Sequence, residues 1–108
     1  MSRYILSPQA KSDIREIRKY IARNNPTAAQ HLVESIRQKC KVIADFPNMG
    51  RSYANVASSL RGIPSGSYLI LYRPIETGIE VARVISGYRN LEAEFLGQED
   101  SISEDESG

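Results

Sequence analysis

Four residues in the second half of the chain could act together on a phosphate group: Arg61, Arg83, Tyr88 and Arg89. An arginine can hold a phosphate through two parallel hydrogen bonds, and a tyrosine hydroxyl can in principle relay a proton. Cleavage of RNA by its own 2′-hydroxyl requires a base for that proton, an acid for the departing 5′-oxygen and cations beside the phosphate. These four residues are the best nuclease site that the sequence offers.

The same residue types are poor acids and bases at neutral pH. A free tyrosine titrates near pH ~10 and arginine is effectively always protonated, so both would need strongly perturbed pKa values to act as a base. The one histidine, His31, lies near the start of the second expected helix, where a solvated or capping role is more common than catalysis. We therefore expect these cationic and aromatic side chains to bind a partner, and we assign that role to Arg51, Arg61, Arg73, Arg83, Tyr88 and Arg89.

The composition is that of one soluble globular domain. The 108 residues fall at the usual size for a single domain, and 41% of them are hydrophobic and 25% charged. The apolar runs are too short to cross a bilayer and the N-terminus lacks the features of a secretory signal, so we expect a cytoplasmic protein with no membrane contact. The single cysteine, Cys40, cannot form an internal disulfide or a metal cluster, and we assign it to the core. We expect neither a metal nor a cofactor.

The net charge of +1 conceals an uneven distribution of charge along the chain. Residues 97–108 contain five acids and no base, whereas residues 1–96 contain all 14 Lys and Arg against eight acids, a formal charge of +6. We expect residues 1–96 to form the folded domain and residues 97–108 to form an acidic, disordered tail. The basic field of the domain suits an acidic partner, either a nucleic acid or an acidic protein segment.

Cap residues and prolines predict a short strand and two helices in the first half. Residues 3–6 read as a strand, and Ser7-Pro8 supplies an N-cap hydroxyl followed by a proline suited to the first helical turn. Asn24-Asn25-Pro26 repeats this pattern, so one helix ends there, a second begins, and the short connection makes them an antiparallel hairpin. The second helix ends at residues 46–50. The apolar faces of the two helices consist of Ala10, Ile14, Ile17 and Ile21, and of Ala29, Leu32, Val33, Ile36, Cys40 and Ile43.

The second half changes to the periodicity of strands. Residues 68–72 are apolar on both faces, as expected for a central strand that is covered by helices, and we assign Tyr68 and Tyr72 to the core. Turn-forming residues on either side predict an antiparallel meander of strands 59–63, 68–73 and 79–86. Asn90 could cap a last helical turn at residues 91–96. The order predicts an α+β fold of two layers: a strand, a helical hairpin and a three-stranded meander.

Several segments in this order resemble the RelE/ParE toxin superfamily, and the resemblance covers nearly all of residues 3–96. The segments are Leu6-Ser7-Pro8-Gln9-Ala10, the helical residues Asp13, Ile14, Ile17 and Tyr20-Ile21, and then residues 47–51, 60–66, 68–74, 79–84 and 87–91. The ParE branch is the most similar, because of the Tyr68 to Pro74 run and of a last strand that ends in Gly-x-Arg followed by a polar and an aliphatic residue.

The resemblance implies a toxin of a type II toxin–antitoxin system, neutralised by a cognate ParD-like antitoxin. For ParE-like members the implied target is DNA gyrase, trapped in its cleaved-DNA state, whereas RelE-like members cut messenger RNA in the ribosome. Many RelE-like nucleases have a lysine-rich stretch before the central strand, and residues 52–60 contain no lysine. We therefore favour a gyrase inhibitor over a ribosome-dependent mRNA endonuclease that uses Arg61, Arg83, Tyr88 and Arg89.

Two further expectations concern binding. An acidic antitoxin segment could dock at the open edge of the sheet or in the groove beside the helical hairpin. A third possible function is a non-catalytic nucleic-acid-binding module, since a charge of +6 attracts phosphate without a specific site. We rank that function last, because we find neither aromatics interleaved with the arginines nor a convincing helix-turn-helix.

Overall fold

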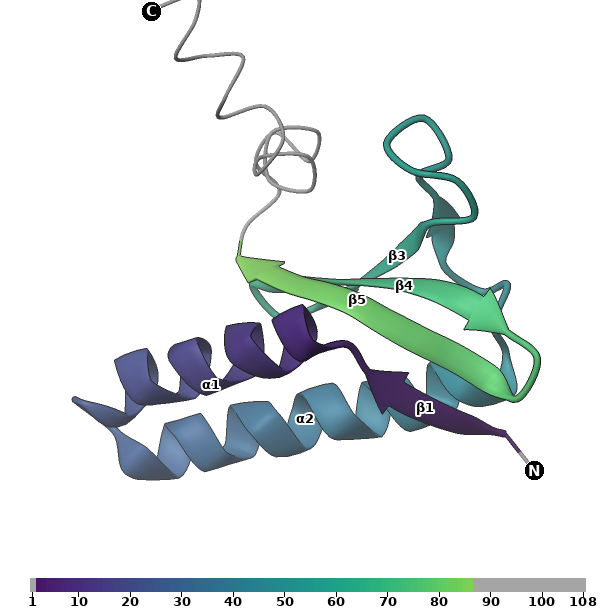
Figure 1. Cartoon of the computed structure of the whole chain (residues 1–108). Coiled ribbons are helices and arrows are strands. Elements are labelled where there is room, and N and C mark those ends of the chain that lie inside the picture. The colour runs from purple at the N-terminus through teal and green to yellow at the C-terminus, as the bar shows by residue number, and fades with distance from the viewer. Residues whose placement is uncertain (1, 87–108) are drawn as a thin grey trace, which may run out of the picture.

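The computed structural model describes residues 2–86, and its elements follow the expected order (Figure 1). They are β1 (Arg3–Leu6), α1 (Pro8–Ala22), α2 (Pro26–Asp45), β2 (Arg51–Ser52), β3 (Arg61–Ser65), β4 (Tyr68–Ile75) and β5 (Gly78–Ser86). The α+β class with a helical hairpin and a three-stranded antiparallel meander is confirmed. The expected helical turn at 91–96, the acidic tail and the residues Tyr88 and Arg89 lie outside the described residues.

The two helices begin at the expected cap residues. The Ser7 hydroxyl accepts a hydrogen bond from the backbone N–H of Ala10 at 3.0 Å, and the Asn25 side chain accepts one from Ala28 at 3.0 Å. A proline occupies the first turn of each helix, where its missing N–H costs no hydrogen bond. The cap side chain and the proline therefore determine where each helix begins. The two helices form a hairpin that lies against the sheet (Figure 1).

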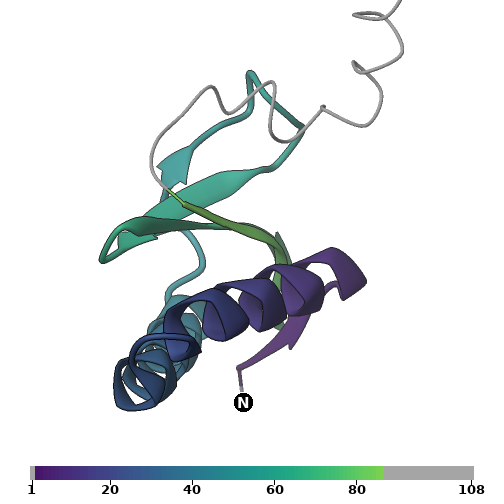
Figure 2. The ribbon, with the colours of Figure 1, turned by 90° about the vertical axis from the view of Figure 1, so that its left-hand side faces the viewer.

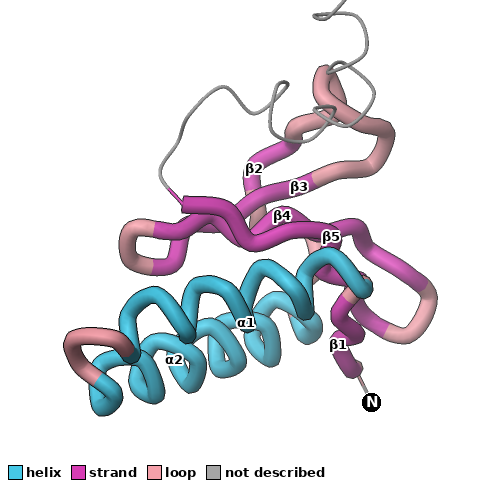
Figure 3. The backbone as a smooth tube through the Cα atoms, turned by 60° about the vertical axis from the view of Figure 1, so that its left-hand side comes forward, coloured by secondary structure: helices cyan, strands magenta, loops and turns pink. Residues whose placement is uncertain are grey.

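The sheet has five strands in the order β1-β5-β4-β3-β2, two more than the expected meander (Figure 3). β1 pairs with β5 in parallel, from Arg3 opposite Gly78 to Leu6 opposite Val81. The two-residue β2 pairs with the start of β3. The meander is therefore flanked by one strand from the N-terminus and by one short strand that follows α2.

Two apolar clusters cover the two faces of the sheet. The helices pack on one face, where the fully buried Ile70 and Tyr72 of β4 join residues of α1, α2 and β5. On the other face Leu69 and Leu71 of β4 pack against Val56 and Leu60, which belong to the loop after β2. The expectation that helices cover the central strand therefore holds for one face only, because a loop covers the second face (Figure 2). Tyr72 is confirmed as a core residue.

The expected strand limits 59–63 are wrong by two residues at each end, since β3 spans Arg61–Ser65. Ser59 has a left-handed φ of 63°, and the N–H of Leu60 donates to the carbonyl of Ala57, so this segment is a turn. Pro64 can lie within the strand because β2 pairs only with the first two residues of β3, which leaves the Pro64 segment at the edge of the sheet.

Gly78 allows β1 and β5 to pair. Its φ of +147° is rarely adopted by other residues, and a Cβ atom there would lie 1.8 Å from the carbonyl oxygen of Arg3, its partner in the sheet. Gly66 also has a positive φ, of +63°, but a Cβ atom there would meet no other atom within 4 Å. Only at Gly78 does the backbone of a neighbouring strand exclude a side chain as well.

This difference predicts unequal effects of two alanine substitutions. Gly66→Ala should lower the free energy of unfolding by ~1–2 kcal/mol, the usual cost of a left-handed alanine. Gly78→Ala should cost at least ~1–3 kcal/mol more, because β1 must move away. Urea denaturation measures both, and faster hydrogen exchange confined to β1 and its partners should accompany Gly78→Ala. Equal losses for the two variants would show that the Gly78–Arg3 contact does not limit the fold.

Candidate functional site

Asp13 on α1 binds both the side chain and the backbone of β5. Its carboxylate accepts hydrogen bonds from Arg83 Nε at 2.8 Å, from Arg83 Nη2 at 3.1 Å and from the backbone N–H of Val84 at 2.9 Å. The side chains of Arg83 and Asp13 are only 21% and 16% exposed. A bidentate arginine–carboxylate pair is the strongest common form of ion pair. Arg83, expected to bind a phosphate or a partner, therefore has a carboxylate of its own chain as its partner.

The position of this ion pair follows from where β1 ends. The last residue of β1, Leu6, pairs with Val81, so from Ala82 onwards no strand among residues 2–86 pairs with β5 on that side. Ser7 donates its backbone N–H to the carbonyl of Val81 and its hydroxyl to the carbonyl of Ala82, both at 2.9 Å. Together with the Asp13–Val84 bond, these contacts satisfy backbone groups that the sheet edge would otherwise leave unpaired. The start of α1 thus replaces a strand at this edge.

Arg61 and Tyr72 hold the turn between α2 and β2. Arg61 Nη1 donates to the carbonyl oxygens of Gly50, at 2.6 Å, and Asn48, at 3.2 Å. The Tyr72 hydroxyl donates to the carbonyl of Pro47 at 2.7 Å and accepts from the N–H of Gly50 at 3.0 Å. Burial raises the pKa of Tyr72, which keeps this hydroxyl protonated as a donor. Arg61, like Arg83, is thus bonded to its own fold.

The other expected arginines contact different parts of the chain. Arg73 Nε donates to the carbonyl of Ser58 at 3.2 Å, in the loop that covers the outer face of the sheet. Arg51 is exposed, with its guanidinium 5.4 Å from the centre of the Tyr53 ring, a cation–π contact. The proposed nuclease group is therefore divided: Arg61 is bonded to the turn before β2 and Arg83 to α1, whereas Tyr88 and Arg89 lie outside the described residues.

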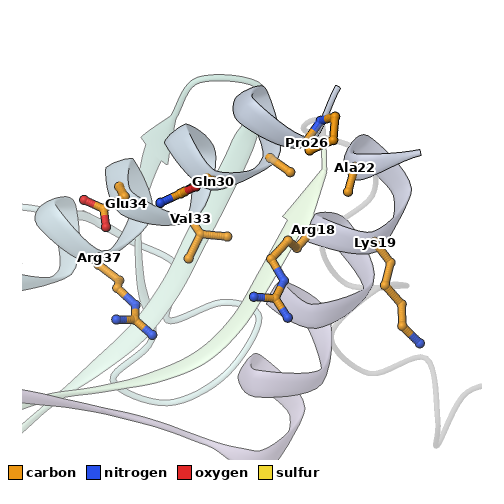
Figure 4. A pocket seen from close by; sticks show the side chains of 9 residues that line it. Arg18, Lys19, Ala22, Pro26, Gln30, Val33, Glu34 and Arg37 are labelled. Carbon is orange, nitrogen blue, oxygen red and sulfur yellow. The ribbon is translucent and has the colours of Figure 1, made fainter. Parts of the chain in front are cut away.

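A groove along the helical hairpin has a lining that the sequence analysis did not identify (Figure 4). A hollow of about 460 Å³ near the turn of the hairpin adjoins one of about 180 Å³ towards the end of β1, since both are lined by Arg18, Val33 and Arg37. We call the combined hollow the hairpin groove. Its full lining is Leu6, Lys11, Ile14, Arg15, Arg18, Lys19, Ala22, Pro26, Ala29, Gln30, Val33, Glu34 and Arg37.

The hairpin groove is basic with an apolar floor. Five of its lining residues are Lys or Arg and one, Glu34, is acidic. Val33 lies between the side chains of Arg18, from α1, and Arg37, from α2 (Figure 4). Neither of these arginines has an ion pair or hydrogen bond to another side chain among residues 2–86. Apolar atoms flanked by available cations suit an acidic amphipathic segment.

Other expected features of the chain can be placed as well. Cys40 is fully buried and burial raises its pKa to about 11, so its assignment to the core is confirmed. His31 is exposed on α2. Within residues 2–86 the structure contains no cluster of three or more His, Cys, Asp or Glu that could hold a metal ion. None of the helices described there combines the length and the apolar character that a membrane span requires.

The Asp13 network predicts a graded loss of stability. Asp13→Asn keeps an acceptor for the N–H of Val84 but loses the charge opposite Arg83, and should lower the free energy of unfolding by ~1–3 kcal/mol. Asp13→Leu should cost ~1–3 kcal/mol more, because it also leaves the N–H of Val84 without its acceptor. Glu16→Gln, at an exposed carboxylate on the same helix, is the control and should change it by less than ~0.5 kcal/mol. Equal urea midpoints for Asn and Leu would contradict the role of the Val84 bond.

The chain is similar to a known protein family and to solved structures. The model of the family described as "ParE toxin of type II toxin-antitoxin system, parDE" matches residues 4–91. Among solved structures, a chain of the "Chromosomal ParDE TA system from P. aeruginosa" is similar, with a TM-score of 0.68 and 18% sequence identity over 82% of this chain and 98% of that chain. No curated protein sequence matches the chain. At 18% identity the structural likeness shows the fold, whereas the family match covers most of the chain. The chain therefore belongs to the ParE toxin family of type II toxin–antitoxin systems.

Proposed function

We propose that this ParE-family chain inhibits DNA gyrase by binding to it and is neutralised by a cognate ParD-like antitoxin. Family membership supports the class of toxin. The observation that carries the choice of inhibition over cleavage is the bidentate pair of Arg83 with Asp13, because both Arg83 Nε and Nη2 already donate to a carboxylate. A phosphate would have to displace that carboxylate from a partly buried site.

The alternative function, cleavage of ribosome-bound messenger RNA, requires a proton acceptor beside the attacking 2′-hydroxyl. Tyr88 and Arg89 could serve such a site only together with cations held nearby. Arg61 donates to backbone carbonyls of the turn before β2, and Arg83 donates to α1, so the two guanidinium groups are bonded to different elements. This division favours a binding protein over a nuclease. A non-specific nucleic-acid-binding module is the third candidate.

For the antitoxin we propose the hairpin groove as the main docking site. Its available cations and apolar floor are complementary to an acidic amphipathic segment. The four-residue β1 is an edge strand of the sheet, so an extended continuation of that segment could pair with it. Of the arginines first assigned to partner binding, the exposed Arg51 is the most accessible in the described part. The assignment of Tyr88 and Arg89 stays a prediction.

Purified protein tests the choice between the two targets. With gyrase and relaxed plasmid, the chain should block supercoiling and accumulate cleaved DNA. If Tyr88 were instead the proton-transfer group of a nuclease, Tyr88→Phe would slow cleavage of ribosome-bound message by ~100-fold or more. Cleavage of that message by the unsubstituted chain, with supercoiling unaffected, would show that the gyrase proposal is wrong.

A pair of charge-matched variants tests the antitoxin site. Arg18→Glu with Arg37→Glu should weaken binding of the adjacent gene's product by about tenfold, as expected when a few exposed ion pairs become repulsive. Arg23→Glu with Lys41→Glu changes the net charge equally at exposed positions outside the hairpin groove and is the control. Titration calorimetry at fixed salt measures both. Equal weakening would mean that only the overall field of the domain, and not the hairpin groove, attracts the antitoxin.

A further inference from the structure

The chain leaves the sheet beside the helix that forms one wall of the hairpin groove. Val84 lies two residues before the end of β5 and donates its N–H to Asp13 on α1. The same helix contributes Lys11, Arg15 and Arg18 to the groove. Ser86, the last residue of β5, is therefore two residues from a contact with α1, a helix that lines the hairpin groove.

The last part of the chain is complementary to this groove in charge and in pattern. Residues 98–106 read Gln-Glu-Asp-Ser-Ile-Ser-Glu-Asp-Glu, which places acids on both sides of one apolar residue, Ile102. The groove presents cations on both sides of Val33, the apolar residue that lines both of its hollows. The segment contains five acids, and the lining contains five Lys and Arg. This match is more specific than a difference in net charge.

The connecting chain is long enough to reach the groove. Twelve residues separate Ser86 from Glu99, and even with residues 91–96 in the expected helical turn they span ~30 Å. The 15 residues of α1 extend over only ~22 Å. Because the segment belongs to the same chain as the groove, its effective local concentration there is on the order of mM. Even an interaction that is weak between separate molecules would then be substantially formed within one chain.

We propose that the acidic segment of residues 99–106 docks in the hairpin groove of its own chain, with Ile102 against Val33 and the acids beside Arg18 and Arg37. The segment then competes with the antitoxin for the groove. This competition rests on the proposed function, whereas the docking itself does not. Removing the segment's charge would make the groove more accessible to an external acidic partner.

The docking is tested in the full-length chain without any antitoxin. A nitroxide label is attached through Ser107→Cys, because Cys40 is buried with a pKa of about 11 and reacts slowly at neutral pH. The label should broaden the NMR signals of backbone amides along the hairpin groove, including those of Ala22, Ala29 and Val33. Neutralising all five acids as Gln or Asn should abolish the broadening, as should 1 M salt, where the screening length falls to ~3 Å.

The two charge-matched double variants also test whether the segment docks in the hairpin groove. Broadening at the groove should disappear in Arg18→Glu with Arg37→Glu and persist in Arg23→Glu with Lys41→Glu. Broadening that is spread over the whole surface, or that is the same in both double variants, would overturn the proposal. Broadening that appears only when a labelled chain is mixed with a separate isotope-labelled chain would also overturn it, since the segment would then occupy the groove of a second copy. Antitoxin binding is a separate readout, and the variant with the five acids neutralised should bind the antitoxin more tightly than the unsubstituted chain does. If the segment docks but this variant does not bind the antitoxin more tightly, the result counts against the proposed function and not against the docking.

Discussion

The attachment of α1 to the open edge of β5 is the interaction on which the rest of the structure depends. β1 covers only the first part of this edge, because it ends opposite Val81. Beyond that point Ser7 and Asp13 take over, and one carboxylate accepts the N–H of Val84 and two donors of Arg83. The contact fixes the hairpin against the sheet, and thereby both the helix-side core and the exposed groove between the helices.

The arginines of the described residues differ in what they bind. Three on the central strands β3, β4 and β5 are bonded to the protein itself: Arg83 to a carboxylate, Arg61 and Arg73 to backbone carbonyls. Those on the hairpin, Arg18 and Arg37, have no such partner among residues 2–86 and line a groove with an apolar floor. Desolvated, paired guanidinium groups stabilise a fold, whereas available ones beside apolar surface can bind a partner. Of the two docking places expected from the sequence, this division favours the groove beside the helical hairpin, which we propose as the main one.

Features that depend on neighbouring residues could be predicted from the sequence, and features that depend on distant ones could not. Ser7-Pro8 and Asn25-Pro26 determine the helix starts locally, and both were predicted. The pairing of Asp13 with Arg83 joins residues 70 apart, and no local pattern indicates it. The packing of Val56 and Leu60 on the outer face is equally non-local, so the loop that covers β4 was not foreseen. The cations of α1 were visible off its apolar face, but their proximity to Arg37 depends on helix packing.

We propose that this ParE-family chain acts by binding an enzyme rather than by cutting RNA. Induction of the chain in cells, with and without the adjacent open reading frame, tests it most directly. We expect growth arrest with filamentation and induced DNA repair, and relief of the arrest when the adjacent reading frame is expressed together with the chain. Arrest with an immediate loss of translation and no DNA-damage response would show that the chain acts on the ribosome and not on gyrase.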